Sequence, residues 1–255
     1  MRRVIKIGTS TVLTKEGGLD AGRLRIIAEG VTRLMDCGDE VALVVSGAVG
    51  LGRGFLAGSG AHEAPRPALA ALGQIALMQA YQAAFQPTLV AQLLMEQNHV
   101  AQPNSAIALQ AALHHLWNFA MVPLVNENDA LSGAGHRIGD NDTLAAMLAG
   151  LITADQLVIL SDIDGLYTDN PSTNPAATRI SLLPRISHEH FGQFGEGSPG
   201  PWGSGGIRSK LKAAKIAQDF GIETILASGR DDAVWGNLVD QRYDRYTRFA
   251  AQKEA

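Results

Sequence analysis

The chain lacks several features that would narrow its function at once. Its 255 residues contain a single cysteine, Cys37, so no intramolecular disulfide can form. Aromatic residues make up only 5%, and the formal net charge of −4 offers no general attraction to nucleic acid or to an anionic membrane. No glycine is followed directly by lysine anywhere in the chain. That absence excludes a P-loop nucleotide site.

The chain also has no apolar run long enough to span a membrane. Its first six residues include two adjacent arginines but no apolar core of a signal peptide. We therefore expect a cytoplasmic protein that contacts neither membrane nor nucleic acid. Apolar residues nevertheless account for 46% of the chain, which is enough for a sizeable buried core in one large α/β domain or two small ones.

Short β-rich runs alternate with longer helical patterns. Predicted strands cover residues 3–7, 41–45, 89–95, 121–125, 157–160 and 223–226, and predicted helices cover residues 20–36, 68–85, 105–117, 141–151 and 206–220. Strands separated by helices favour a three-layer α/β/α sandwich around a mostly parallel central sheet. Residues 168–177 and 192–206 are expected to be excursions from the sheet, with the second a rim over a site. Neither marks a domain boundary, so we expect one domain over residues 1–255.

The most informative pattern is a dense polar cluster. Asn126-Glu127-Asn128-Asp129 is followed ten residues later by Gly139-Asp140-Asn141-Asp142. In a core, each of these side chains would need its own hydrogen-bond partner, so we expect a loop that binds a small polar ligand. A turn followed by a helix N-cap is the simpler alternative. It explains Asp140 or Asn141 but not the whole cluster.

Polar or glycine-rich loops also follow other predicted strands, at the edge where open α/β sheets bind ligands. They are Lys6-Ile7-Gly8-Thr9-Ser10, Ser46-Gly47-Ala48, Ser161-Asp162 and Gly203-Ser204-Gly205-Gly206-Ile207-Arg208-Ser209-Lys210. Glycines before a helix let backbone N–H groups approach an anion. The last run therefore predicts a phosphate site that includes Lys210, whereas an ordinary strand-to-helix turn is an equal alternative for the first two.

No metal site is expected. The spacing after Asp162 and Asp164 lacks the later ligands of a calcium loop. His188 and His190 would point apart from Glu189 on a strand, and no third ligand is evident. His136, inside the polar loop, is a minor candidate for contact with a ligand.

Together these segments resemble glutamate 5-kinases of the amino-acid kinase superfamily. The resemblance rests on Lys6–Ser10, Val45–Ala48, Asn126–Ala130, Gly139–Asp142, Leu160–Tyr167 and Gly203–Lys210, in this order, and extends to about Phe249. It implies a single amino-acid kinase domain, with the acceptor site in its N-terminal part and the nucleotide site in its C-terminal part. The implied reaction is transfer of phosphate from ATP to the γ-carboxylate of L-glutamate, the first step of proline biosynthesis.

The resemblance also implies roles for individual residues. Lys6 and Lys210 would hold the transferring phosphoryl group, and Asp142 would orient both lysines. The glutamate site would comprise Ser46, Gly47, Ala48, Asn126, Asp129, Asp140 and Asn141, with Asp129 facing the ammonium group. The ATP site would comprise Lys6, Gly8, Ser161, Asp162, Ser204, Gly205, Gly206, Ile207, Arg208, Ser209 and Lys210. Mg²⁺ would bridge the nucleotide phosphates with few or no direct protein ligands.

The chain departs from the family pattern in three places. Ile207 and Ser209 replace the usual Met and Thr. Residues 96–110, which the resemblance associates with the substrate or inhibitor side, also differ from the usual sequence. Many bacterial members carry a C-terminal PUA domain, and this chain ends before one. We therefore expect a kinase-only homodimer or homotetramer, with L-proline as a candidate feedback inhibitor.

Two alternatives stay open. One is another carboxylate or phosphate kinase of the superfamily, although Asp129 argues against an acetylated acceptor without a free ammonium. The other is a catalytically silent nucleotide-binding regulatory or storage protein. The lysine–aspartate–lysine set at positions 6, 142 and 210 argues against it.

Overall fold

The computed structural model describes residues 1–56, 64–96, 99–100, 102–131, 140–169, 171, 173–193 and 206–252. Within this part, an eight-stranded sheet runs in the order β3-β4-β2-β1-β5-β9-β10-β8. The bounds are β1 Arg2–Ile7, β2 Glu40–Val44, β3 Val90–Met95, β4 Val122–Glu127, β5 Gln156–Ser161, β8 Leu182–Leu183, β9 Glu223–Ser228 and β10 Thr247–Phe249. All neighbours pair in parallel except β9 and β10.

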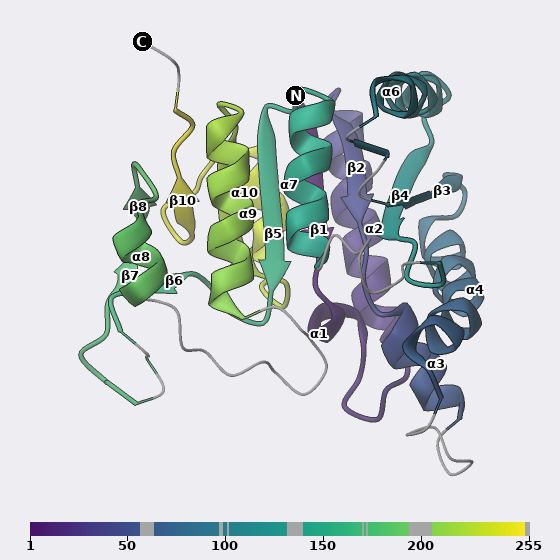
Figure 1. Cartoon of the computed structure of the whole chain (residues 1–255), viewed down its shortest axis with the longest axis horizontal. Coiled ribbons are helices and arrows are strands. Elements are labelled where there is room, and N and C mark those ends of the chain that lie inside the picture. Colours follow the sequence, from purple (N-terminus) through teal and green to yellow (C-terminus); the bar gives the residue numbers. More distant parts are fainter. Residues whose placement is uncertain are drawn as a thin grey trace.

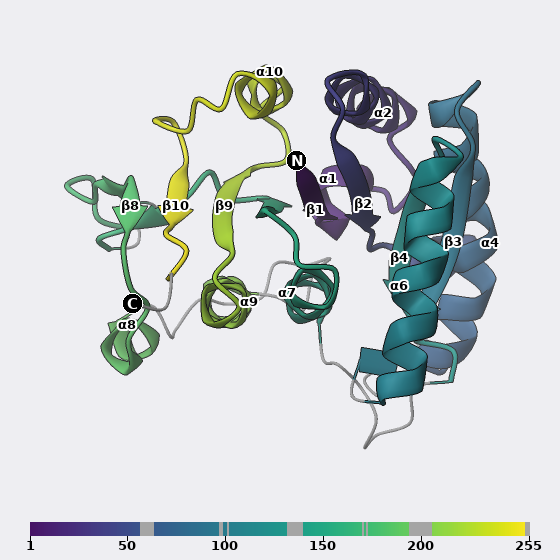
Figure 2. The same cartoon turned by 90° about the horizontal axis from the view of Figure 1, so that it is seen from above.

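Helices cover both faces of this sheet. One face carries α2 Ala21–Asp36, α3 Ala48–Phe55, α4 Arg66–Phe85 and α10 Ala233–Val239. The other carries α6 Pro103–Asn118, α7 Asn141–Leu151 and α9 Ile207–Asp219. Figure 2 shows α2 and α10 on one side of the strands and α7 and α9 on the other. The predicted three-layer sandwich around a mostly parallel sheet is confirmed, and no helix of the described residues has the length and apolarity needed to cross a membrane.

Strand β1 shows how the two cores divide. Ile5 and Ile7 pack into the core beneath α2 and α4, whereas Val4 packs into the core beneath α7 and α9. Successive side chains of a strand point to opposite faces, so Lys6 lies on the same face as Val4. A buried lysine on that face needs an anionic partner, and α7 supplies it.

Local signals in the sequence place the helix ends. Asp20 caps α2 by accepting a hydrogen bond from the backbone N–H of Arg23 at 2.9 Å. Past the other end of α2, Gly38 has φ +86°, a conformation that favours glycine. Helix α7 has the predicted bounds, Asn141–Leu151, because Asp140 caps it in the same way.

The chain after β5 differs most from the prediction. The short strands β6 Leu166–Tyr167 and β7 Arg179–Ile180 pair as a separate antiparallel ribbon, which confirms that residues 168–177 leave the main sheet. His188, Glu189 and His190 were expected on a strand, and that expectation is wrong. They begin a helix, α8 His188–Gln193. The predicted rim lies mostly outside the described residues.

Two glycines allow α3 and α4 to approach closely. A Cβ added to Gly52 would lie 2.0 Å from the carbonyl oxygen of Leu69, and one added to Gly73 would lie 1.9 Å from that of Ala48. Both neighbours are backbone atoms of a packed helix, so neither can yield easily. The contact ties α4 to the loop before α3, where Gly47 adopts φ +119°.

We predict that Gly73→Ala destabilises the fold by about 2–3 kcal/mol through overpacking. For a chain of this length, that loss lowers the melting temperature by about 5–10 °C. Thermal unfolding followed by circular dichroism measures it. The control is Gly236→Ala in α10, where an added Cβ meets no atom within 4 Å. Equal melting temperatures for the two variants would contradict the proposed contact.

Candidate active site

The predicted site residues that the structure describes gather at the carboxyl ends of the parallel strands, at the edge marked by the arrowheads of β2 and β5 in Figure 1. Lys6 is the penultimate residue of β1, Ser46 follows β2, Asn126 lies near the end of β4, and Ser161 ends β5. Parallel strands bring residues that are distant in sequence to one edge. Gly139, Ser204, Gly205 and His136 lie outside the described residues.

Asp142, in the first turn of α7, is the centre of a buried ion-pair cluster. Lys6 Nζ lies 2.7 Å from its Oδ1, and Lys210 Nζ lies 3.4 Å from its Oδ2. The Ser209 hydroxyl donates a hydrogen bond to Oδ2 at 2.7 Å. The exposed fractions of the three charged side chains are only 10%, 5% and 1% for Lys6, Lys210 and Asp142. Two cations thus share one anion, an arrangement suited to an anionic ligand.

The protonation state of Asp142 follows from these neighbours. Burial acts to raise the pKa of its carboxyl group. The charges of Lys6 and Lys210, together with hydrogen bonds from Lys6 and Ser209, outweigh burial and lower that pKa to about 2. The carboxylate is therefore ionised at neutral pH and holds both lysines.

Asn141, the residue before Asp142, organises a second cluster. Its Nδ2 lies 2.7 Å from Ser46 Oγ, 2.9 Å from Asn126 Oδ1 and 2.8 Å from the Val45 carbonyl oxygen. Within the described part of the chain, the buried Oδ1 of Asn141 accepts no hydrogen bond. Buried amide oxygens rarely stay unpaired, so this atom is positioned to accept a hydrogen bond from a ligand.

The N-terminus of α7 thereby joins the two clusters. Asn141 reaches towards the ends of β2 and β4, and Asp142 reaches towards β1 and α9. The helix terminus itself also favours negative charge. Asp140 serves α7 as its N-cap, accepting hydrogen bonds from the Thr143 N–H at 2.7 Å and hydroxyl at 3.3 Å. The role of helix N-cap, the simpler alternative from the sequence, therefore applies to Asp140. Burial raises the pKa of its carboxyl group.

The remaining nucleotide candidates line the same edge. Gly8 donates its N–H to the carbonyl oxygen of Leu160 at 2.9 Å, so the loop after β1 touches β5. Ser161 is buried, and its hydroxyl accepts a hydrogen bond from the Ile163 N–H at 3.1 Å. Asp162 follows it at the surface. Gly206 is the N-cap of α9, whose first turn carries Ile207, Arg208, Ser209 and Lys210.

Two residues of α4 were not predicted from the sequence. Gln74 accepts a hydrogen bond from Asn126 Nδ2 at 3.0 Å. The Arg66 guanidinium contacts Asp129 Oδ1 at 3.2 and 3.3 Å. Both residues belong to a mostly apolar helix without a motif, and only the packing of α4 brings them to the site. The one available signal in the sequence was for Gln74, a polar residue directly after Gly73 in the middle of the helix.

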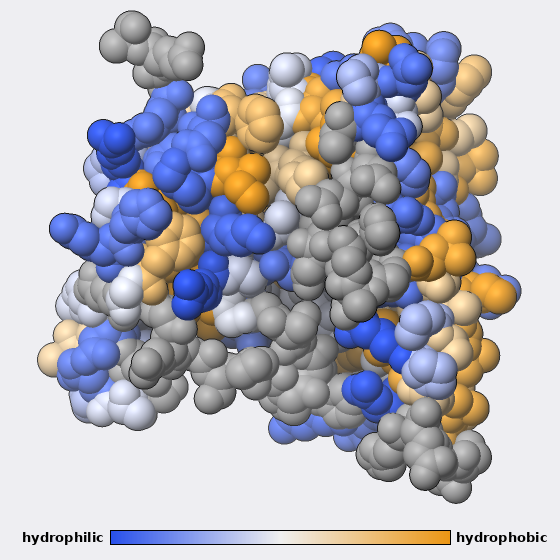
Figure 3. All heavy atoms as spheres, viewed as in Figure 1, coloured by the Kyte–Doolittle hydropathy of each residue, from blue (hydrophilic) through white to orange (hydrophobic). Residues whose placement is uncertain are grey.

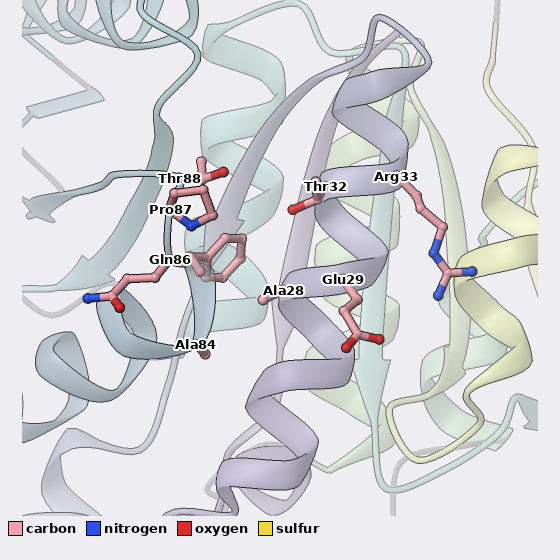
Figure 4. Close-up of a pocket in the computed structure, with 9 residues that line it drawn as sticks. Ala28, Glu29, Thr32, Arg33, Ala84, Gln86, Pro87 and Thr88 are labelled. Carbon is pink, nitrogen blue, oxygen red and sulfur yellow. The ribbon is translucent and has the colours of Figure 1, made fainter.

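A separate pocket of about 380 Å³ lies between α2 and the turn after α4. Figure 4 shows Ala28 and Thr32 on the side of α2 that faces the segment with Gln86, Pro87 and Thr88, whereas the side chain of Arg33 extends away from that segment. That segment leads into β3 and so lies at the amino end of the strand. No predicted site residue lines this pocket, and we assign it no part in the chemistry.

Comparisons with known proteins connect this geometry to a family. A model described as the amino acid kinase family matches residues 1–228. The glutamate 5-kinase of Moorella thermoacetica is 40% identical over 89% of this chain and 61% of its own length. The glutamate 5-kinase of Symbiobacterium thermophilum is 38% identical over 89% of this chain and 88% of its own length. The chain thus spans less than two thirds of the Moorella relative but most of the Symbiobacterium one.

Solved structures show the same fold at low identity. UMP kinase from Bacillus anthracis aligns with a TM-score of 0.68 and 18% identity, covering 99% of this chain and 96% of that one. Carbamate kinase from Giardia lamblia bound to AMP-PNP aligns with a TM-score of 0.67 and 17% identity, covering 98% of each. At such identities the likeness concerns the fold alone.

The lowered pKa of Asp142 predicts how stability depends on pH. The pKa of its carboxyl group falls from 3.8 to about 2 in the fold. The stabilisation is therefore complete above about pH 5 and is lost as the pH falls towards 2. Asp142→Asn should flatten this part of the pH profile. It should also cost about 3–5 kcal/mol at pH 7, because two buried lysines lose their counter-charge.

Urea unfolding at pH 7, 4 and 3 measures both effects. Asp240→Asn, which changes a carboxylate that is 46% exposed, is the control and should keep the wild-type profile. A profile for Asp142→Asn as steep as that of the wild type would show that Asp142 does not hold the lysines as an ionised group.

Proposed function

The chain belongs to the amino acid kinase family, and we propose that it transfers the γ-phosphoryl group of ATP to the γ-carboxylate of L-glutamate. The product, L-glutamyl 5-phosphate, is the first intermediate of proline biosynthesis. The observation that best supports this reaction is the position of Asn141 and Asp142. These adjacent residues join a cluster of amide side chains to a buried pair of lysines. Relatives named glutamate 5-kinase, at 38–40% identity, support the choice of acceptor.

The chemistry needs positioning and charge stabilisation rather than a base. A γ-carboxylate oxygen attacks the γ-phosphorus, a new O–P bond forms, and the bond to the β–γ bridging oxygen breaks to release ADP. The attacking carboxylate is already ionised at neutral pH, so no proton has to be removed.

The two lysines supply the charge stabilisation. Lys6 and Lys210 approach Asp142 from different elements, and the carboxylate fixes both ammonium groups without neutralising both charges. Negative charge spreads over the phosphoryl oxygens during transfer, and donors preorganised around it stabilise the transition state. Each well-placed donor is worth about 3–4 kcal/mol by analogy with oxyanion holes.

The acceptor half of the site, which is the cluster around Asn141 together with Asp129, would hold L-glutamate by its polar ends. Asp129 offers a carboxylate to the ammonium group, and the Oδ1 of Asn141 offers an acceptor within the buried amide cluster. Ser46 and Asn126 fix the orientation of Asn141. Gly47, which lacks a Cβ, would let the backbone at the start of α3 come close to the acceptor, with Ala48 beside it.

ATP would bind across the loops after β1 and β5 and the start of α9, using the nucleotide residues predicted from the sequence. Mg²⁺ would neutralise charge on the nucleotide phosphates. No group of three or more His, Cys, Asp or Glu side chains in the described ranges is arranged to hold a metal ion. Asp142 is moreover committed to the lysines. We therefore propose a Mg²⁺ that would be held mainly by phosphate oxygens and water.

We further propose a homo-oligomer that forms through the edge of the sheet. Strand β3 is an edge strand of the described sheet, with Leu94 39% exposed, and α4 beside it exposes Leu72 and Ile75. Figure 3 shows apolar side chains gathered along this side of the molecule. Exposed apolar edges of this kind mark association sites. Light scattering should then give a mass at least twice that of one chain.

An enzyme that consumes ATP and L-glutamate would work in the cytoplasm, where both are abundant. L-Proline, like glutamate, carries a cationic amine beside an α-carboxylate. It would therefore compete for the acceptor half if it acts as a feedback inhibitor.

The reaction is tested by ATP turnover with purified protein and Mg²⁺, supplied with L-glutamate, N-acetyl-L-glutamate, L-aspartate or no acceptor. Hydroxylamine converts an acyl phosphate into a hydroxamate that can be measured by its colour with iron. We expect turnover and hydroxamate with L-glutamate alone. Hydroxamate with another acceptor would overturn the substrate assignment. ATP binding without any turnover would favour the silent regulatory protein.

Lys210→Ala should lower kcat by about 100-fold or more, because the loss of one preorganised charge costs about 3 kcal/mol in the transition state. The KM for L-glutamate should change little, since Lys210 lies on the phosphoryl side of Asp142. Steady-state kinetics separate the two parameters. Lys215→Ala, on the exposed side of the same helix, is the matched control. An unchanged kcat for Lys210→Ala would remove this lysine from the mechanism.

A further inference from the structure

We propose that Arg66 binds the α-carboxylate of the amino-acid acceptor, so that Arg66 and Asp129 together recognise a zwitterionic head group. This inference rests on the proposed function and adds to it a residue that selects the substrate. Its starting point is the ion pair that joins the first residue of α4 to the turn after β4.

The geometry of this pair is that of a loose contact. Nε and Nη2 of Arg66 both point to a single oxygen, Asp129 Oδ1, at 3.3 and 3.2 Å. An arginine fork that matches a carboxylate uses two parallel bonds of about 2.7–2.9 Å. Arg66 is also 44% exposed, whereas Asp129 is 11% exposed. Because Arg66 is partly exposed and the contact lacks fork geometry, the ion pair adds little stability and opens at small cost.

The location of the pair links it to the acceptor cluster. Along α4, Gln74 contacts Asn126, and Arg66, eight residues earlier, contacts Asp129. These two contacts lie about 12 Å apart along the helix axis. The tight packing of α4 on α3 holds the helix against the loop that carries Ser46. Arg66 therefore stands at the outer end of the cluster that contains Asn141.

Charge matching then suggests the ligand group. If Asp129 pairs with the ammonium of an amino acid, Arg66 loses its partner while the ligand brings an α-carboxylate to the same place. The guanidinium can take that carboxylate in a fork, which Arg does better than Lys. Exchange of the Arg66–Asp129 pair for two protein–ligand pairs leaves no charge uncompensated. An acceptor without both charges would forfeit one of these contacts.

The test compares Arg66→Ala with the wild type on L-glutamate, 4-aminobutyrate, which lacks the α-carboxylate, and glutarate, which lacks the ammonium. Arg66→Ala should raise the KM for L-glutamate and glutarate about 10- to 100-fold, the effect of one charge-assisted contact, with kcat within about threefold. It should leave the KM for 4-aminobutyrate unchanged. Arg66→Lys should recover only part of the loss. The control is Arg242→Ala, an arginine that is 67% exposed after α10.

The outcomes separate this inference from the proposed function. An equal rise in KM for all three acceptors, or a fall in kcat alone, would mean that Arg66 only holds the turn after β4, and would overturn the proposal. If the wild type turned over no acceptor, the proposed function would fail, and calorimetry with L-glutamate would decide the role of Arg66. Binding weakened by Arg66→Ala would support that role, whereas unaffected or absent binding would reject it.

Discussion

The site depends on one carboxylate shared between two lysines. Lys6 and Lys210 come from opposite ends of the chain, and two buried ammonium groups would repel each other without the ionised Asp142 between them. The same carboxylate accepts a hydrogen bond from the Ser209 hydroxyl. Two consecutive residues of α9, Ser209 and Lys210, therefore bind α7 through Asp142. Ion pairs and a hydrogen bond to Asp142 thus hold β1, α7 and α9 together above the apolar core.

The first turn of α7 extends this arrangement to the acceptor. Asn141 and Asp142 are adjacent in sequence and point to different partners, so one helix end sets the distance between the amide cluster and the lysine pair. The parallel sheet makes this possible, because the carboxyl ends of β1, β2, β4 and β5 lie at one edge. Helix α4 reaches the same edge from the other face through its two close glycine contacts with α3.

The sequence predicted the central strands and helices within a few residues, because period, capping and turn signals there agree with the fold. It also indicated Lys6, Asp142 and Lys210, since glycine-rich and polar motifs surround them. Arg66 and Gln74 carried no such signal, and their position depends on how α4 packs. The late short elements, such as α8 and β10, escaped prediction because they are only a few residues long and tertiary contacts determine them.

The central claim is that the substrate carboxylate, ionised and unassisted by a base, attacks phosphorus beside these lysines. The most direct test supplies L-glutamate labelled with ¹⁸O in its γ-carboxylate, together with Mg²⁺ and ATP. The acyl phosphate is then cleaved with hydroxylamine, which attacks the carbonyl carbon and leaves the bridging oxygen on phosphorus, and the released phosphate is examined by ³¹P NMR. We expect one ¹⁸O atom in each phosphate, carried across in the new O–P bond. Unlabelled phosphate would show that water attacks instead, and would contradict the assignment of the carboxylate as the nucleophile.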